Sequence, residues 1–287
     1  MSLVAPTPLG FERSPVAGTG LDDLDLPALH AFLRRRMTNA SGASGPSGPS
    51  GLPERLAGES PETGLLPAFE RAAQRLGLVA TINSQSVPTV VGLMAFGTVP
   101  QLARPEWGVA CVRVRGANLA DEVATRLDVE GPIAALVDQT LEFVRSNTRV
   151  VPNLLRPSEP ASEYPEIAVR EALLNAILHR DYRLSGRVSL RIFNDRLEVW
   201  SPGGLAIPLS LDDLAQHGGA SFPRNPLLTA TARSLGLVEQ VGRGIPLIRK
   251  TLGQATSLPV QFVTAQTDVR VVLPSYINAS MGNVAGN

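Results

Sequence analysis

The stretch REALLNAILHRDY, residues 170–182, decides the fold that we expect for this chain. Its apolar residues recur at helical spacing, and Glu171, Asn175 and His179 stand at i, i+4 and i+8, so their side chains form one polar stripe. Alanines lie on one side of this stripe and larger aliphatic residues on the other. Because alanine lets another layer approach closely, we expect the stripe to line a cleft.

A carboxylate and a carboxamide one helical turn apart suit a hard cation and a water molecule. The amide oxygen of Asn175 can ligate Mg²⁺ while the carboxylate of Glu171 polarises an attacking water. The spacing alone favours a plainer alternative, in which Arg170, Arg180 and Asp181 form a capping or ion-pair network along the helix. Both interpretations stay open at this point.

The segments around this helix predict an α+β fold, with helices on one face of a mixed, mostly antiparallel sheet. Strands are expected at 187–193, 196–200, 259–264 and 268–273, with hairpin turns at 194–195 and 266–267. Helices are expected at 166–180, from residue 210, at 226–235 and at 245–252. We expect Asn225 to cap the helix that starts at Pro226, and Arg224 to be a lid residue or solvated.

Two glycine turns belong to the same part of the chain. One follows a strand and contains Ser201, Gly203 and Gly204, while the other immediately precedes a helix and consists of Gly242, Arg243 and Gly244. Free N–H groups and the positive dipole end at the start of a helix can hold a phosphate. Each turn is also explained by the ordinary use of glycine in a tight turn or in a loop entering a helix.

In this order the segments resemble the GHKL ATPase fold shared by gyrase-type topoisomerases, histidine kinases and MutL. REALLNA (170–176) is similar to its N box, WSPGG (200–204) stands in the place of its first glycine box, and VGRGIPLIRK (241–250) is similar to its second. Together with PRNPLL (223–228) and LGLVEQVGRGIPLI (235–248), these segments resemble more closely a bacterial group of RecG-related helicase C-terminal domains and transcriptional regulators.

The resemblance implies a GHKL-like (Bergerat) sandwich with roles for the stripe and the glycine turns. Glu171 would activate water, Asn175 would ligate Mg²⁺, and the backbone of residues 242–244 would cradle the phosphates of ATP. Ser201, Gly203 and Gly204 would belong to the nucleotide site, although the adenine-binding aspartate of the first glycine box is replaced by Ser201 or Pro202. For His179 we hypothesise a contact with the phosphates, and a buried structural histidine is the equal alternative.

The function that we expect is ATP and Mg²⁺ binding in DNA metabolism or transcriptional regulation, with weak ATP hydrolysis left open. The alternative is a degenerate, non-catalytic scaffold that serves as a DNA- or protein-interaction module. DNA binding rests on the family association and on strand arginines, which are more often just the solvent face of an alternating strand. These are Arg113, Arg115, Arg187 and Arg191. A homodimer is expected because related ATPases act in pairs.

The remaining organisation is read from composition. Residues 22–37 predict a short helix capped by Asp25, in which Arg34, Arg35 and Arg36 are interpreted as cations at the helix C-terminus. We expect an N-terminal extension (1–38), a flexible Gly/Ser/Pro linker (39–62), an α+β segment (63–155), the GHKL-like nucleotide-binding domain (156–274) and a disordered tail (275–287). Members of the group commonly carry a Schlafen/AlbA-like domain, whose pattern we do not find here.

Composition also excludes several classes. The 26 basic and 26 acidic residues balance, which argues against a surface built mainly for nucleic acid or an anionic membrane. One cysteine and three scattered histidines give no disulfide framework and no zinc spacing. Lys250 is the only lysine and lies in no GxxxxGK[ST] motif, so a P-loop helicase is excluded. Without a membrane-spanning run or a signal peptide, the protein is expected in the cytoplasm.

Overall fold

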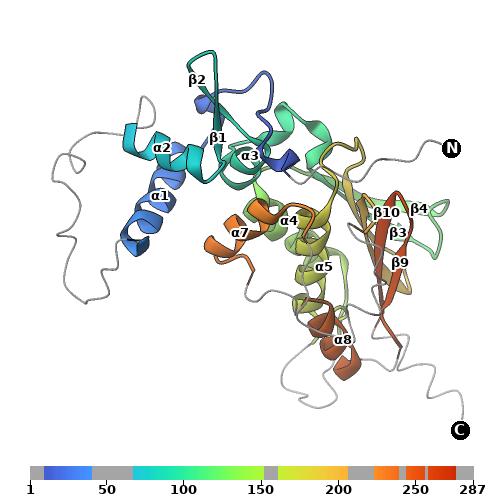
Figure 1. The fold of residues 1–287 in the computed structure, drawn as a ribbon. Helices are drawn as coiled ribbons and strands as arrows, with labels where there is room; N and C mark the ends of the chain where they lie inside the picture. The colour runs from blue at the N-terminus through green and yellow to red at the C-terminus, as the bar shows by residue number, and fades with distance from the viewer. Residues whose placement is uncertain are drawn as a thin grey trace, which may run out of the picture.

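The computed structural model describes residues 10–40, 67–151, 161–205, 223–238, 244–255 and 258–275 (Figure 1). At its centre is a six-stranded sheet with the order β4-β3-β7-β8-β10-β9. The strands are β3 (Val109–Arg115), β4 (Glu122–Val129), β7 (Val188–Ile192), β8 (Arg196–Pro202), β9 (Gln261–Thr264) and β10 (Asp268–Pro274). Only β3 and β7 pair in parallel among these strands, which confirms the expected mixed, mostly antiparallel sheet.

Strand alternation explains which face of the sheet is buried. Cys111, Leu190, Val199 and Val271 stand side by side across four neighbouring strands, and each is at most 8% exposed. Their neighbours in sequence point to the opposite face. The two hairpins turn at 194–195 and around 266–267 as expected.

Three helices lie on one side of this sheet in Figure 1. They are α4 (Ile133–Asn147), α5 (Glu166–His179) and α8 (Gly244–Ala255). Helix α5 is central among them and buries Leu173, Leu174 and Ile177 to at most 2% exposure. Each such side chain stabilises the fold by about 1.5–3 kcal/mol. The α+β architecture therefore places α5, with its polar stripe, between the sheet and α8.

The N-terminal part adds α1 (Leu26–Ala40), α2 (Pro67–Arg75), the hairpin of β1 (Val79–Ile82) and β2 (Gln85–Pro88), and α3 (Val90–Phe96). Short 3-10 helices are η1 (Phe11–Arg13), η2 (Leu21–Asp23), η5 (Pro100–Leu102) and η6 (Pro105–Trp107), and β5 (Val150–Val151) pairs with β6 (Ala161–Ser162). Helix α7 (Pro226–Ser234) precedes α8 in the chain. The Asp25 carboxylate accepts a hydrogen bond from the backbone N–H of Ala28 at 2.9 Å, so the expected cap of α1 is confirmed.

The arginines of α1 serve a different helix from the one that we expected. Because α1 continues to Ala40, Arg34, Arg35 and Arg36 do not lie in its last turn. Instead, Nη2 of Arg35 donates to the carbonyl oxygen of Ser234 at 3.1 Å, and Nη1 of Arg36 donates to the Ser234 hydroxyl at 3.5 Å. Ser234 ends α7, so these cations complement the dipole of α7 rather than that of α1.

Two observations concern the expected domain boundaries. Strands β3 and β4 come from the expected 63–155 segment, yet they belong to the same sheet as the strands after residue 155. Most of the expected linker, the tail from 276 and the helix expected from residue 210 lie outside the described residues. Among the residues that are described, no helix has the length and apolar character needed to cross a membrane.

Candidate functional site

The polar stripe of α5 is partly open to solvent. Glu171, Asn175 and His179 are all half-buried, whereas Ala172 and Leu174 beside them are at most 2% exposed. The stripe thus follows a seam between two buried sides of the helix.

Helix α8 begins directly on this stripe. A Cβ atom placed on Gly244 would lie 2.9 Å from Oε2 of Glu171 and 3.0 Å from Nδ2 of Asn175. The first residue of α8 must therefore be very small for both side chains to keep their positions. The first N–H groups of a helix have no partner within the helix, so the start of α8 brings backbone donors next to a carboxylate and a carboxamide.

Arg170 and Arg180, which were expected to form the competing ion-pair network with Asp181, have other partners. Arg170 lies 3.9 Å from a carboxylate oxygen of Asp138, on α4. Arg180 is 1% exposed and donates to the backbone carbonyls of Glu106, Leu184 and Gly186. The Asn175 side chain forms no hydrogen bond with any residue that the structure describes. Its amide oxygen is thus available to a ligand.

The C-terminal end of α5 is closed by four side-chain donors. The last four carbonyl groups of a helix lack partners within it. In α5 these carbonyls accept hydrogen bonds as follows: Ala176 from Oγ of Ser201 at 2.7 Å, Ile177 from the Tyr182 hydroxyl at 3.1 Å, Leu178 from Nδ2 of Asn225 at 2.9 Å, and His179 from Nε of Arg224 at 3.2 Å. We call these four donors, Tyr182, Ser201, Arg224 and Asn225, the α5 cap.

Two members of the α5 cap correct expectations from the sequence. Asn225 occupies the N-cap position of α7, but its side chain makes no capping bond there and instead donates to Leu178 and to Arg180 at 2.9 Å each. The buried carboxylate of Glu12 takes over the role, accepting from the N–H groups of Leu227 at 2.9 Å and Leu228 at 2.8 Å. A pattern of neighbouring residues could not show that the N–H groups at the start of α7 are capped by a residue more than 200 positions away in the sequence.

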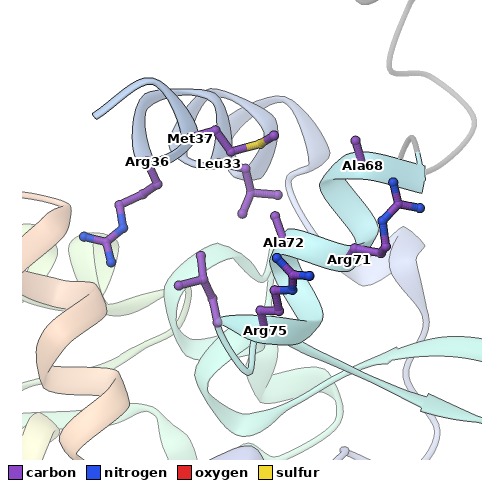
Figure 2. Close-up of a pocket in the computed structure, with 8 residues that line it drawn as sticks. Leu33, Arg36, Met37, Ala68, Arg71, Ala72 and Arg75 are labelled. Carbon is purple, nitrogen blue, oxygen red and sulfur yellow. The ribbon is translucent and has the colours of Figure 1, made fainter. Parts of the chain in front are cut away.

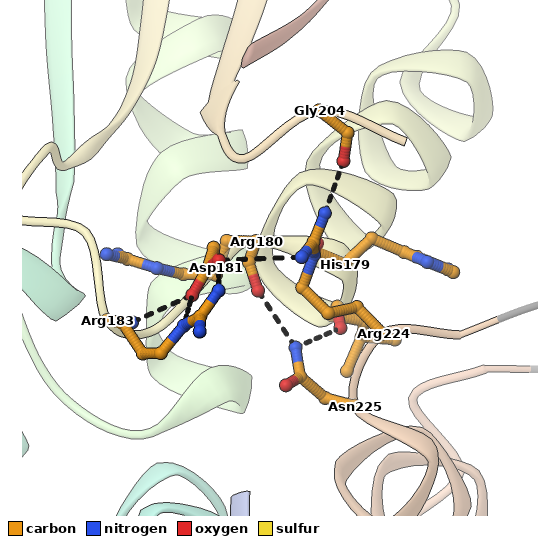
Figure 3. A network of polar contacts seen from close by, with 8 residues as sticks. His179, Arg180, Asp181, Arg183, Gly204, Arg224 and Asn225 are labelled. Atoms are coloured by element: carbon orange, nitrogen blue, oxygen red, sulfur yellow. Dashed lines mark hydrogen bonds and ion pairs between the residues drawn. The ribbon is translucent and has the colours of Figure 1, made fainter. Parts of the chain in front are cut away.

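Arg224 is neither solvated nor at the edge of the structure. Its side chain is 9% exposed and lies 3.4 Å from Oδ2 of Asp181. It also donates to the carbonyl oxygen of Gly204, so it joins the end of α5 to the glycine turn after β8 (Figure 3). The sequence gives no signal for this contact, because Arg224 and Gly204 are 20 residues apart with no pattern linking them.

Asp181 anchors the cluster in Figure 3 electrostatically. Burial alone would raise the pKa of this carboxyl group, but hydrogen bonds from the side chain and backbone N–H of Arg183 outweigh it, assisted by the charges of Arg183 and Arg224. The pKa of Asp181 is lowered to about 2. The carboxylate is therefore ionised at neutral pH and fixes both guanidinium groups.

His179 closes the stripe at the last residue of α5. Burial, together with the nearby positive charge of Arg224, lowers the pKa of its imidazole to about 4. The ring is therefore neutral at pH 7. It forms no hydrogen bond to the parts of the chain that are described, so neither of the two expected roles is decided by its contacts.

The glycine turn after β8 is occupied by contacts within the protein. Gly203 has φ +100, and a Cβ atom there would lie 2.8 Å from Cβ of Asp181. A Cβ atom on Gly204 would lie 2.5 Å from the carbonyl oxygen of Ala265, at the end of β9. Ser201 is 6% exposed, and its one hydroxyl hydrogen is used in the α5 cap. Close packing therefore explains these three residues without a ligand.

Other expected site residues lie elsewhere. Gly242 and Arg243 fall outside the described residues. All four strand arginines have partners within the sheet region: Arg113 donates to Asn194, Arg115 pairs with Glu122, Arg187 with Asp128 and Glu130, and Arg191 donates to Ser189. In the described ranges no three His, Cys, Asp or Glu side chains are grouped as a metal site.

Comparison with known proteins supports the family expected from the sequence. Residues 186–273 match the family described as "Putative ATP-dependent DNA helicase recG C-terminal". This family is of the ATPase type, which implies nucleotide binding. The matched range begins after α5, so Glu171 and Asn175 lie outside it. A comparison with curated proteins gives no match.

A solved structure shows the same fold over nearly the whole chain. The DIP2311 protein from Corynebacterium diphtheriae superposes with a TM-score of 0.60 at 20% sequence identity, covering 92% of this chain and 47% of that one. This chain thus spans about half the length of that relative. Residues 186–273 therefore match the RecG C-terminal family, in a chain with an α+β, GHKL-like fold.

Proposed function

We propose that the chain binds a magnesium nucleotide, ATP in the first place, where the start of α8 meets the stripe of α5. The contact of Gly244 with Glu171 and Asn175 is the observation that carries this proposal. It brings together the three chemical groups that a phosphate–metal ligand needs, namely backbone donors, a carboxamide oxygen and a carboxylate. The ATPase type of the matched family supports the same ligand.

The residues of this chain fit such a ligand on two observations. Asn175 has a side-chain amide without a partner among the described residues, so its oxygen can ligate the ion. The absence of a side chain at Gly244 removes a Cβ atom that would crowd Glu171 and Asn175, which leaves room for a phosphate oxygen beside them. When bound, Mg²⁺ would neutralise phosphate charge. Glu171 would orient a water molecule and accept its proton, which is the step that weak ATP hydrolysis requires.

Several finer statements belong to this proposal. A role in DNA metabolism or transcriptional regulation and contact with DNA are supported by the RecG-related description of the matched family. A homodimer is expected because related ATPases act in pairs, and a cytoplasmic location because the sequence has neither a membrane-spanning run nor a signal peptide. The strand arginines add no support for contact with DNA, because all four already have partners.

Calorimetric titration of Mg-ATP and Mg-ADP tests the proposal. Saturable binding is expected for the wild type, with at least about a tenfold loss of affinity in Asn175→Ala, since a metal ligand is removed. Glu171→Gln should retain binding and lose any hydrolysis. Asn147→Ala on α4 and Glu166→Gln, whose carboxylate pairs with Arg145 on the surface, are matched controls. Undiminished affinity in Asn175→Ala would contradict the proposed site.

The second candidate is a scaffold that has kept the fold without the nucleotide. It is favoured by Ser201, Gly203 and Gly204, which are all engaged in contacts within the protein. A thermal shift separates the two functions, because a ligand at 100 times its Kd stabilises the native state by about 2.7 kcal/mol. An unchanged Tm at millimolar Mg-ATP would support the scaffold.

A further inference from the structure

We propose that a groove between α1 and α2 binds an acidic, amphipathic helical segment of a partner protein. The groove encloses about 620 Å³ between the two helices (Figure 2). It lies in the N-terminal part of the chain, before the region matched by the family, and contains none of the residues proposed for nucleotide binding. The argument rests on its apolar base and its charged rim.

The base of the groove is apolar and shallow enough for another helix to approach. Leu33 of α1 is fully buried at the base, and Leu76 follows α2 with a half-buried side chain. Ala68 and Ala72 stand one turn apart on α2 and line the same groove. Small residues at i and i+4 let a neighbouring helix pack closely, so leucine side chains of a partner could reach the base.

The rim of the groove is positively charged, and no carboxylate among the described residues pairs with its arginines. Arg36 of α1 and Arg71 and Arg75 of α2 line it, and all three are exposed. Arg71 and Arg75 lie one helical turn apart, so their like charges repel each other. Neither forms an ion pair within the described parts of the chain. The partner of Arg36 among the residues that the structure describes is the Ser234 hydroxyl, at 3.5 Å.

No acidic side chain of the two helices can neutralise this rim. The sequence of α1 contains no aspartate or glutamate. In α2 the only acidic residue is Glu70, whose carboxylate accepts a hydrogen bond from the hydroxyl of Ser86 on β2. Charge complementarity therefore calls for carboxylates from outside, and guanidinium groups suit them because they can bind both oxygens.

The apolar base distinguishes an acidic peptide from a nucleic acid. Phosphate backbones would neutralise the arginines but would leave Leu76 and the two alanines, which are all half-buried, uncovered. A helix with leucines on one face and glutamates beside them covers the base and pairs with the rim at the same time. The balanced net charge of the whole chain also provides no general attraction for nucleic acid.

Fluorescence anisotropy on the full chain tests the proposal with a labelled synthetic helix of about 16 residues, with leucine on one face and glutamate beside it. We expect saturable binding that weakens at least about tenfold in the double variant Arg71→Glu and Arg75→Glu, and also in Ala72→Leu, which fills the groove. The double variant Arg115→Glu and Arg126→Glu, with the same change of charge on the distant β3–β4 hairpin, should bind as the wild type does. Circular dichroism confirms that each variant is folded.

Five outcomes would overturn the proposal. The first three are an absence of binding by the wild type, a peptide affinity that is unchanged in both groove variants, and an equal loss of affinity in those variants for a peptide with glutamine in place of glutamate. The fourth is binding that appears only after residues 44–62 are deleted, because the chain's own segment would then be the occupant. A single-stranded oligonucleotide that binds through the same arginines as tightly as the peptide would assign the groove to nucleic acid instead.

Discussion

The hydroxyl hydrogen of Ser201 is directed at the carbonyl oxygen of Ala176, 2.7 Å away, in a part of the molecule closed to solvent. A residue at this position in the GHKL fold would be expected to meet adenine. Here it satisfies a helix carbonyl that would otherwise lie buried without a partner, at a cost of about 1–3 kcal/mol. The hydroxyl oxygen keeps lone pairs that can accept a further hydrogen bond. The side chain of Ser201 therefore serves to hold the end of α5.

At the same scale, His179 should make stability depend on pH. Its pKa is about 4 in the folded chain against 6.5 for an ordinary histidine, so between these values the unfolded chain binds a proton that the folded chain does not. The contribution of His179 is complete above pH 6.5 and is lost as the pH falls towards 4. Urea unfolding at pH 7, 6 and 5 should show a smaller decline for His179→Gln than for the wild type.

A second histidine, His30, provides a comparison for this experiment. Burial and Arg34 also lower the pKa of His30, which stacks on Phe69 at 4.9 Å. His30→Gln should therefore reduce the decline independently, while the double variant should reduce it further. Equal slopes for the wild type and His179→Gln would show that the His179 imidazole is protonated in the folded protein.

At the scale of elements, two glycines that look alike in the sequence have different functions. A Cβ atom on Gly204 would meet backbone oxygens of Ala265 and Gln266 at 2.5 and 2.6 Å, which cannot move without shifting the β9–β10 turn. On Gly244 it would meet only the ends of the Glu171 and Asn175 side chains. The first glycine thus serves packing, and the second leaves room at the proposed site.

These contacts predict opposite effects of the same substitution. Gly204→Ala should lower the free energy of unfolding by about 1–3 kcal/mol, because backbone must shift. Gly244→Ala should leave it nearly unchanged, since alanine favours a helix, but should weaken Mg-ATP binding. Urea unfolding and calorimetry on both variants measure this. Strong destabilisation by Gly244→Ala, or full nucleotide affinity in it, would contradict the assignment.

Helix α7 shows what holds an element whose neighbours in sequence do not cap it. Glu12→Gln should destabilise the fold by about 0.5–2 kcal/mol, because the carboxylate that accepts from Leu227 and Leu228 is weakened at a helix N-terminus. Asp22→Asn, on an exposed side chain of the same charge, is the matched control. If Asn225 were the cap instead, Glu12→Gln would be silent in urea unfolding.

The elements also show how far the sequence can be read. Strands β7 and β8, both hairpin turns and α5 follow from period, turn residues and caps within a few neighbours, and the structure confirms them. The stripe follows from helical spacing. The contacts of Glu12 with α7, of Arg35 with Ser234 and of Arg224 with Gly204 join residues far apart in sequence, so no local pattern encodes them. Two site residues, Gly242 and Arg243, lie outside the described chain and stay predictions.

At the scale of the whole molecule, the N-terminal and C-terminal parts share one core. Strand β3 pairs with β7 in register from Val109 with Val188 to Arg113 with Ile192. Nε1 of Trp107 donates to the carbonyl oxygen of Tyr182 at 3.3 Å, and the two rings meet edge to face at 5.3 Å. Separating the parts at residue 155 would make β7 an edge strand and would remove the cross-strand pairing of Cys111 with Leu190.

Such a core should unfold as one cooperative unit, and the two tryptophans report on its two parts. Trp107 precedes β3, and Trp200 lies on β8. In the single-tryptophan variants Trp107→Phe and Trp200→Phe, the urea midpoint from fluorescence should coincide with that from far-ultraviolet circular dichroism, because every strand of the sheet loses its neighbours together. If the 63–155 segment were an independent domain, fluorescence of Trp107 would change at a different urea concentration from the circular dichroism signal. That result would support the expected boundary near residue 155 and would imply that the parallel β3–β7 pairing contributes little to stability.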